Sequence, residues 1–347
     1  MHYQAEGPHV ELPPEPQVPP QSSVTLVSGQ QPNEPGWAGQ HAGGHSNGGY
    51  GPVADLPPSP SQPLDDQYWQ TEPTGHAYNE PIYRSNALPT EGTYNAPWGG
   101  ELLPAGLLFR PYLAGEKESR FASQWLWEND GQMFWEVSLG GRVGLWRYGS
   151  SGPNPEGFQF DMEGAGLVRL SPENNTDVEA MDFRFGLLAT WREGPWSAKA
   201  GYYHISSHLG DEFLLRNRRF PRLNYVRDSL VTGASYDWSD SIRTYVEAAY
   251  AVGHQDGALP LEFQYGAEYS SPLTDSFGGP FAAINGHTRE DFDWQTSVNV
   301  VTGWQWRGVN TDHRFRAGVQ YYSGPALQYS FAGRNEQLVG CGLWFDY

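Results

Sequence analysis

The stretch FDWQTSVNVVTGWQWR, residues 292–307, decides the fold, because apolar and polar side chains alternate along most of it. Its even positions carry Phe, Trp, Thr and Val, with Phe or Trp at both ends. Its odd positions are mostly polar or small, from Asp293 through Asn299 to Arg307. Successive side chains of a β-strand point to opposite faces. The stretch therefore predicts a strand with one apolar face, framed by aromatic residues, and one polar face.

The same alternation recurs along the chain from about residue 117 to the C-terminus. Residues 260–271 and 314–322 repeat it clearly, with Phe and Tyr on one face and Glu, Gln or Arg on the other. Nine further segments show a period of two between Gly, Pro, Asn and Asp turn signals: 119–127, 133–148, 156–171, 177–192, 196–208, 221–238, 241–254, 279–287 and 327–347. The sequence therefore predicts an all-β chain of about twelve strands.

Alternation by itself fits both a water-soluble sandwich and a membrane barrel. Three features favour the barrel. The segments are longer than the roughly five or six residues of an ordinary strand and reach the roughly 9–11 residues that cross a bilayer. Trp and Tyr lie at the ends of the apolar faces, as in an interfacial girdle, and the opposite faces are charged, as in a barrel lumen. We expect an antiparallel transmembrane β-barrel, with a soluble antiparallel β protein at a cell surface as the alternative.

The C-terminus supports the same interpretation. Residues Val339, Cys341, Leu343, Phe345 and Tyr347 form an apolar stripe that ends in an aromatic side chain. This pattern resembles the recognition signal of bacterial outer-membrane barrels and implies that location. The opening MHYQAEGPHV lacks the basic and apolar regions of a signal peptide. We therefore expect the native start to lie elsewhere if the chain is exported.

Composition divides the chain into three parts. Residues 1–100 hold 17 of the 28 prolines and ten acidic residues against one basic residue, which predicts a disordered tail. Residues 101–116 are expected to be a linker, and residues 117–347 the barrel. The net charge of −19 and the lack of a basic patch argue against nucleic acid as a partner. Cys341 is the single cysteine, so no internal disulfide forms.

The densest run of potential catalytic side chains is GYYHISSHLGDEF, residues 201–213. His204 and Ser206 are two residues apart, so a strand places them on one face. They share the outward, lipid-facing parity of Tyr202, which is an unusual place for polar groups. Asn224, in the following strand segment, has the same parity. If the two strands pair as a hairpin, the three polar side chains meet near the rim as a nucleophile, a base and an amide that orients the base.

The pattern His-x-Ser on one strand, followed by Asn on the next, resembles outer-membrane phospholipase A. That family is a twelve-stranded barrel with a Ser/His/Asn site on its lipid-facing exterior, and it hydrolyses phospholipid acyl esters with calcium. The resemblance implies Ser206 as nucleophile, His204 as base and Asn224 as orienting residue, with membrane lipids as partners. It also implies calcium, for which Asp211 and Glu212 in the adjacent loop offer hard oxygen ligands.

The string GPWSAKAGYYHISSHLGDE, residues 194–212, is similar to an uncharacterised family of bacterial surface proteins with a domain of unknown function. That resemblance implies a β-barrel and no particular activity. The sequence departs from the phospholipase family directly after His-x-Ser, where Ser207 and His208 replace Asn and Gly. Asn217 is a rival to Asn224, and it lies in a basic stretch, Arg216–Arg219, suited to lipid phosphate.

Interpretations without catalysis remain open for these residues. His204, Ser206 and His208 could be rim residues that hydrogen-bond to loop backbone. A strand would hold the two histidines about 13 Å apart, too far to chelate one ion, which leaves His208 with Asp211 and Glu212 as the alternative metal set. Two functions follow: a barrel without enzymatic activity, serving as envelope structure or narrow channel, or a calcium-dependent acyl hydrolase that works through Ser206. The oligomeric state is not predicted.

Overall fold

The computed structural model describes residues 97–347, except 151–153, 273–276, 309–312, 332 and 347. The disordered tail predicted for residues 1–100 lies outside the described residues, apart from its last four. Of those four, Gly99 and Gly100 belong to a short strand, β1 (Gly99–Leu102). Among the described residues, no helix is both long and apolar enough to cross a membrane.

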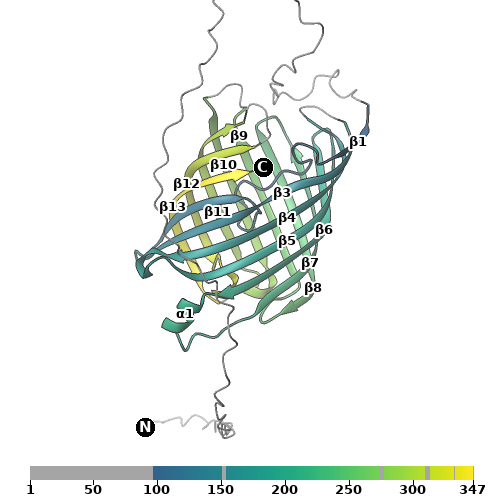
Figure 1. Ribbon diagram of the computed structural model, residues 1–347. Helices are drawn as coiled ribbons and strands as arrows, with labels where there is room; N and C mark the ends of the chain where they lie inside the picture. Colours follow the sequence, from purple (N-terminus) through teal and green to yellow (C-terminus); the bar gives the residue numbers. More distant parts are fainter. Residues whose placement is uncertain (1–96, 151–153, 273–276, 309–312, 332, 347) are drawn as a thin grey trace, which may run out of the picture. The chain divides into compact units, whose positions relative to one another are not determined.

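Twelve long strands form one antiparallel sheet that closes into a barrel (Figure 1). Each strand pairs with the next along the chain, and the last strand pairs back with the first, Phe345 opposite Phe121. The strands are β2 (Phe121–Glu128), β3 (Met133–Gly149), β4 (Gly157–Ser171), β5 (Asp177–Glu193), β6 (Trp196–Leu209), β7 (Tyr225–Asp237), β8 (Ile242–Gln255), β9 (Leu261–Ser270), β10 (Gly279–Arg289), β11 (Thr296–Arg307), β12 (Arg314–Pro325) and β13 (Asn335–Asp346). The predicted antiparallel barrel of about twelve strands is confirmed.

Four short helical elements lie in the connections. These are η2 (Pro172–Asn174), α1 (Asp211–Arg216), η3 (Glu290–Phe292) and η4 (Tyr329–Phe331). We call the rim that carries the connection 210–224, with α1, the α1 end. The rim that contains the last residues of β13 is named the β13 end. The two ends are opposite each other in Figure 1.

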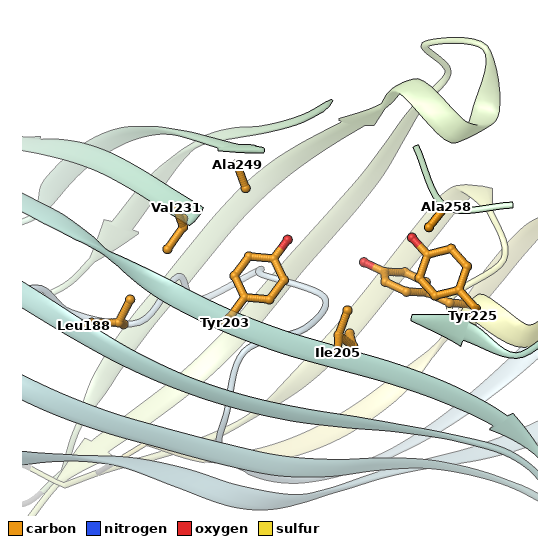
Figure 2. Packing of buried hydrophobic residues seen from close by; sticks show 8 residues of the cluster. Leu188, Tyr203, Ile205, Tyr225, Val231, Ala249 and Ala258 are labelled. Carbon is orange, nitrogen blue, oxygen red and sulfur yellow. The ribbon is translucent and has the colours of Figure 1, made fainter. Parts of the chain in front are cut away.

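The alternation in the sequence sorts side chains between the two faces of the wall as predicted. Along β11, Ser297, Asn299 and Gln305 are buried in the interior, whereas Thr302 and Trp304 are exposed on the outside. Because a closed barrel wall has only an inside and an outside, the period of two becomes an inside–outside pattern. Figure 2 shows one apolar cluster of the interior, which includes Tyr203 and Ile205 of β6.

The predicted strand segment 292–307 begins four residues before the strand that the structure has there, β11. Phe292 ends η3, and Asp293 and Trp294 form a turn with positive φ angles of 52° and 62°. The hairpin between β10 and β11 needs this left-handed turn to reverse the chain, so β11 starts at Thr296. Residues 221–224 and 327–334, which the alternation also included in strands, likewise lie before the first residue of β7 and β13.

The segment assigned to a linker enters the barrel. β1 pairs with β3 through Trp146–Gly149, and β2 pairs with β3 through Met133–Ser138. The chain between β1 and β2 leaves the wall, and most of its side chains from Leu107 onward are buried, as Phe109 and Tyr112 are completely. We call residues 103–120 the interior segment.

Polar and aromatic contacts attach the interior segment to the wall. The Leu113 amide donates to Glu268 over 2.6 Å, and Asn299 donates to the Ala114 carbonyl over 2.8 Å. The ring of Tyr112 stacks on Tyr245 with centroids 3.8 Å apart. The segment fills part of the lumen that twelve strands would otherwise leave open.

One carboxylate of the interior segment illustrates how charge is accommodated there. Burial alone would raise the pKa of Glu116, but hydrogen bonds from His287 and Ser297 outweigh burial and lower that pKa. The Ser297 hydroxyl donates to Glu116 over 2.5 Å. Glu116 is therefore held ionised against two neighbouring strands.

Buried ion pairs occupy much of the remaining interior. Arg169 is almost completely buried and donates to Glu136 and to both carboxylate oxygens of Glu336. Lys117 of the interior segment pairs with Asp182 at 2.5 Å. A buried charge is tolerated when it is paired and hydrogen-bonded. Buried ion pairs therefore link the interior faces of several strands to one another and to the interior segment.

Candidate functional site

The candidate site lies on the outer wall, where β6 and β7 pair. Tyr203, Ile205 and Leu209 of β6 are buried inside, so Tyr202, His204 and Ser206 point outward. Figure 2 shows Tyr203 and Ile205 among interior side chains. Ser206 is three residues from the end of β6, about 10 Å along the strand, which places the group towards the α1 end. The outward parity that the sequence predicts for His204 and Ser206 is what the structure has.

Across the β6–β7 pairing, the residue opposite His204 is Asp228. His204 Nδ1 lies 2.8 Å from Asp228 Oδ1, and the Tyr202 hydroxyl donates to the same oxygen over 2.5 Å. The His204 and Asp228 side chains are each 36% exposed. Asp228 therefore fixes one ring nitrogen of His204 and leaves Nε2 directed elsewhere.

Ser206 lies two positions along β6 on the face of His204. Two residues of a strand span about 6.6 Å, so side chains on the same face can meet after a rotamer change. Within the described part of the chain, no hydrogen bond joins Ser206 to His204. Catalytic hydrogen bonds are often long before substrate binds, so the missing contact does not by itself decide whether the two side chains act together.

The wall next to Asp228 contains a local irregularity. The register between β7 and β8 shifts between Asp228 and Ser229, which is a β-bulge. Gly253 lies opposite Asp228, and a Cβ atom added there would come 3.1 Å from Asp228 Oδ2. The bulge and the glycine together leave space for an outward-pointing carboxylate.

Apolar side chains surround this polar group. Phe183 and Phe185 of β5 lie opposite Ser206 and His204 and are 47% and 43% exposed. Leu230 of β7 lies opposite Tyr202 and is 55% exposed. Ionisable groups on an outward, otherwise apolar barrel face are energetically unfavourable if lipid covers it. A bonded His–Asp pair at this place therefore points to a function rather than to packing.

The structure separates Asn224 from His204. Asn224 lies just before β7 and is exposed. Its backbone N–H donates to Asp256 over 2.9 Å, and its side-chain amide donates to Gln255 over 3.4 Å. The rival Asn217 caps α1 by donating to the Phe213 carbonyl over 3.0 Å. The structure places Asp228, and neither asparagine, at the imidazole.

Asp211 and Glu212, predicted as calcium ligands, are exposed in the first turn of α1. In the described part of the chain, no three His, Cys, Asp or Glu side chains converge as metal ligands. His208, the third member of the alternative metal set, instead contacts the ring of Phe183. The calcium role of Asp211 and Glu212 stays a prediction.

Asp228 is the residue that the sequence analysis missed, and one signal could have found it. Asp228 has outward parity in the strand segment 221–238, between Val226 and Leu230. A charged residue on an otherwise apolar outward stripe is rare in a barrel and marks a functional position. Placing it opposite His204 would also have required the β6–β7 register, which the long connection 210–224 leaves open in the sequence.

Comparisons with known proteins find barrels of the bacterial envelope. No curated protein matches the chain. Outer membrane phospholipase A from Escherichia coli matches with a TM-score of 0.45 and 15% identity, over 68% of this chain and 93% of that one. The KdgM porin gives a TM-score of 0.38 and 8% identity, over 65% and 98%. The transport unit of the Escherichia coli autotransporter AIDA-I gives 0.39 and 15%, over 70% and 94%.

The match that covers most of the chain is to a family profile described as "Protein of unknown function (DUF1207)", which extends over residues 72–347. It includes the whole barrel, the interior segment and the outward group of His204, Ser206 and Asp228. The chain therefore belongs to the DUF1207 family.

Proposed function

We propose that this protein is an outer-membrane barrel that hydrolyses acyl esters of membrane lipids at its outer wall, with Ser206 as nucleophile. The observation that carries the proposal is the outward hydrogen bond between His204 and Asp228, with Ser206 two residues away on the same face. A nucleophile, a base and a carboxylate that orients the base are the parts that acyl transfer requires.

The outer surface supports a location in lipid. Large apolar side chains cover the middle of the wall, and aromatic side chains lie towards both rims, as in barrels that span a bilayer. The exposed aliphatic residues of the wall include Leu139, Val143, Leu187, Leu230, Val246, Val252, Ile284, Val319 and Val339. The exposed aromatic residues near the rims include Trp127, Trp196, Trp238, Trp294 and Trp304. An apolar surface this continuous is unfavourable in water.

The proposed reaction has two steps. Ser206 Oγ attacks the ester carbonyl carbon while His204 Nε2 takes the hydroxyl proton, and His204 then returns that proton to the departing alcohol. A water molecule attacks the acyl-serine, again with His204 as base, which releases the fatty acid and restores Ser206. Asp228 holds Nδ1 protonated and stabilises the imidazolium that forms in each step.

The interior gives less support to a channel. The interior segment occupies part of the lumen between β1 and β2. Buried ion pairs attach it to the wall or join strands that are not neighbours, as Lys117–Asp182 and Arg169–Glu336 do at 2.5 and 2.6 Å. Passage of a solute would require both the segment and these pairs to move. The exterior group needs no such rearrangement to reach lipid.

Substitution of Val246 with arginine tests whether lipid covers the wall. Val246 is 61% exposed on β8, away from the proposed site. In a phospholipid bilayer we expect V246R to lower the free energy of unfolding by ~2–4 kcal/mol, because a lipid-facing cation at mid-depth is unfavourable. Leu215→Arg, at an exposed leucine of α1, is the matched control and should change it by about 1 kcal/mol or less. Equal stability of V246R and wild type in urea titrations would contradict the membrane location.

The hydrolase itself is tested on the wild-type protein in phospholipid vesicles. We expect fatty acid release and covalent labelling of Ser206 by a fluorophosphonate, because an activated serine attacks the phosphorus of such probes. Peptide mass spectrometry locates the label, and the assay is run with calcium and with a chelator. If fatty acid release and serine labelling are both absent with calcium and with the chelator, the result favours the alternative, a barrel without enzymatic activity.

A further inference from the structure

A second candidate site lies at the α1 end, on the inner side of the wall and away from the outward His204 group. An open pocket of about 370 Å³ is present there, which is within the size range of small-molecule sites. Its lining includes Phe134 of β3, Glu179 of β5, Phe213 and Arg216 of α1, Phe220 and Arg334. The hydrolase proposal uses none of these residues.

Glu179 reaches the pocket because β5 is irregular at this position. The odd-numbered Phe183 of the same strand points outward, so strand parity alone would turn Glu179 outward as well. Val178 and Ala180 each have a partner on β4, whereas Glu179 between them has none and is the extra residue of a β-bulge. Glu179 is only 6% exposed and lines the pocket. Bulges that redirect one side chain are frequent next to functional sites.

The Glu179 carboxylate is buried without a partner. In the described part of the chain, its side chain makes no hydrogen bond and no ion pair. Two arginines nearby serve other acids, because Arg169 binds two glutamates and Arg216 pairs with Asp177. An unpaired buried carboxylate is unfavourable unless a ligand supplies the missing cation.

Arg334 is the second charged group of the lining that is left unpaired. It lies in the connection before β13, is exposed, and places its guanidinium carbon 5.6 Å from the ring centroid of Phe331. Among the described residues it forms no ion pair, and none joins it to Glu179 although both line the pocket. Because Arg216 is neutralised by Asp177, the lining offers one free carboxylate and one free guanidinium.

Aromatic side chains form the apolar part of the pocket. The ring of Phe213 packs edge-on against Phe220 and Phe331, with both centroid distances at 5.2 Å. Phe134 is 2% exposed and lines the pocket from β3. Such a wall favours a ligand with a hydrocarbon side chain, and aromatic faces also attract an ammonium group.

We propose that this pocket binds a free α-amino acid with an apolar side chain. Its ammonium group donates to Glu179, its carboxylate accepts from Arg334, and its side chain contacts Phe213 and Phe220. A simple amine would leave Arg334 unpaired and a simple carboxylate would leave Glu179 unpaired, so the site requires both charges. An ethanolamine phosphate headgroup carries the same two charges. The pocket lies on the inner side of the wall, which favours the soluble ligand.

Calorimetric titration of the detergent-solubilised full chain with three related compounds is the direct test. L-leucine carries both charges, 3-methylbutylamine lacks the carboxylate, and 4-methylpentanoate lacks the ammonium group. We expect wild type to bind leucine about tenfold or more tightly than either analogue, because each analogue loses one charge-assisted contact.

Two substitutions should change this selectivity in opposite ways. Glu179→Gln should abolish the preference for leucine over 4-methylpentanoate, and Arg334→Gln should abolish the preference for leucine over 3-methylbutylamine. A general loss of structure would not give this reciprocal pattern. The matched controls are Glu173→Gln and Arg222→Gln, at exposed residues outside the pocket lining, which should bind all three compounds like wild type.

Thermal unfolding gives a second readout with a distinctive sign. Without ligand, E179Q should be at least as stable as wild type, because the substitution removes an unpaired buried charge. With leucine, the unfolding temperature of wild type should rise and that of E179Q should rise less.

Nanodiscs separate the soluble ligand from the lipid headgroup. We expect leucine to bind equally well in phosphatidylethanolamine and in phosphatidylglycerol nanodiscs. Weaker binding in phosphatidylethanolamine would assign the pocket to the headgroup and contradict the proposal. The proposal is also wrong if wild type binds leucine no more tightly than the two analogues, or if E179Q keeps the wild-type selectivity. Serine labelling at Ser206 is independent of all these results.

Discussion

Replacing Ser206 with alanine is expected to lower fatty acid release from phospholipid vesicles by about 10³-fold or more. The change removes the hydroxyl that would form the acyl-enzyme, and the residual rate reflects binding and polarisation alone. Ser206 is half-buried between Phe183 and Val226 and makes no side-chain hydrogen bond in the described part of the chain. The substitution should therefore leave the barrel's stability nearly unchanged.

Thr232→Ala is the matched control for this experiment. Thr232 lies on the outer face of β7, is exposed, and carries a hydroxyl four residues from Asp228. Its removal should leave activity within about twofold of wild type, since surface substitutions away from a site have small effects. Equal fatty acid release by S206A and wild type would rule out Ser206 as the nucleophile, even if the protein proved to be a hydrolase.

Substitution of Asp228 is expected to have the second largest effect. Asp228→Ala should lower kcat by about 10²- to 10⁴-fold, because His204 loses the group that fixes its tautomer and stabilises its protonated form. Asp228→Asn should lie between wild type and alanine, since an amide oxygen can still accept from Nδ1 but brings no charge. Vesicle assays over a range of pH distinguish the two variants from a simple loss of folded protein.

Asn224→Ala provides the comparison that separates the structure from the sequence-based hypothesis. Asn224 contacts Gln255 and Asp256 at the rim and not His204. Its substitution should change kcat by less than about twofold. A large loss of activity in N224A, together with full activity in D228A, would restore the assignment made from the sequence and contradict the geometric one.

The sequence by itself determined the wall of this protein. Period-two alternation identified the twelve strand segments, and parity placed Trp304, His204 and Ser206 outside and Asn299 inside, as the structure has them. Parity is a local property of an extended backbone, so it survives without knowledge of any partner strand. The ends of strands were less well determined, as at Trp294, because turn geometry depends on the hairpin that it closes.

The tertiary structure alone decided which side chains meet. Asp228 reaches His204 only through the β6–β7 register, which is set across the connection 210–224 and not by a tight turn. The apolar run of the interior segment is too short to predict from the sequence that this segment is buried. It is buried because β1 and β2 pair with different parts of β3. Arg307 of β11 and Arg314 of β12 are likewise opposite each other only because of the register between these two strands. Contacts between residues far apart in the chain depend on register and closure, and no local pattern of residues encodes those.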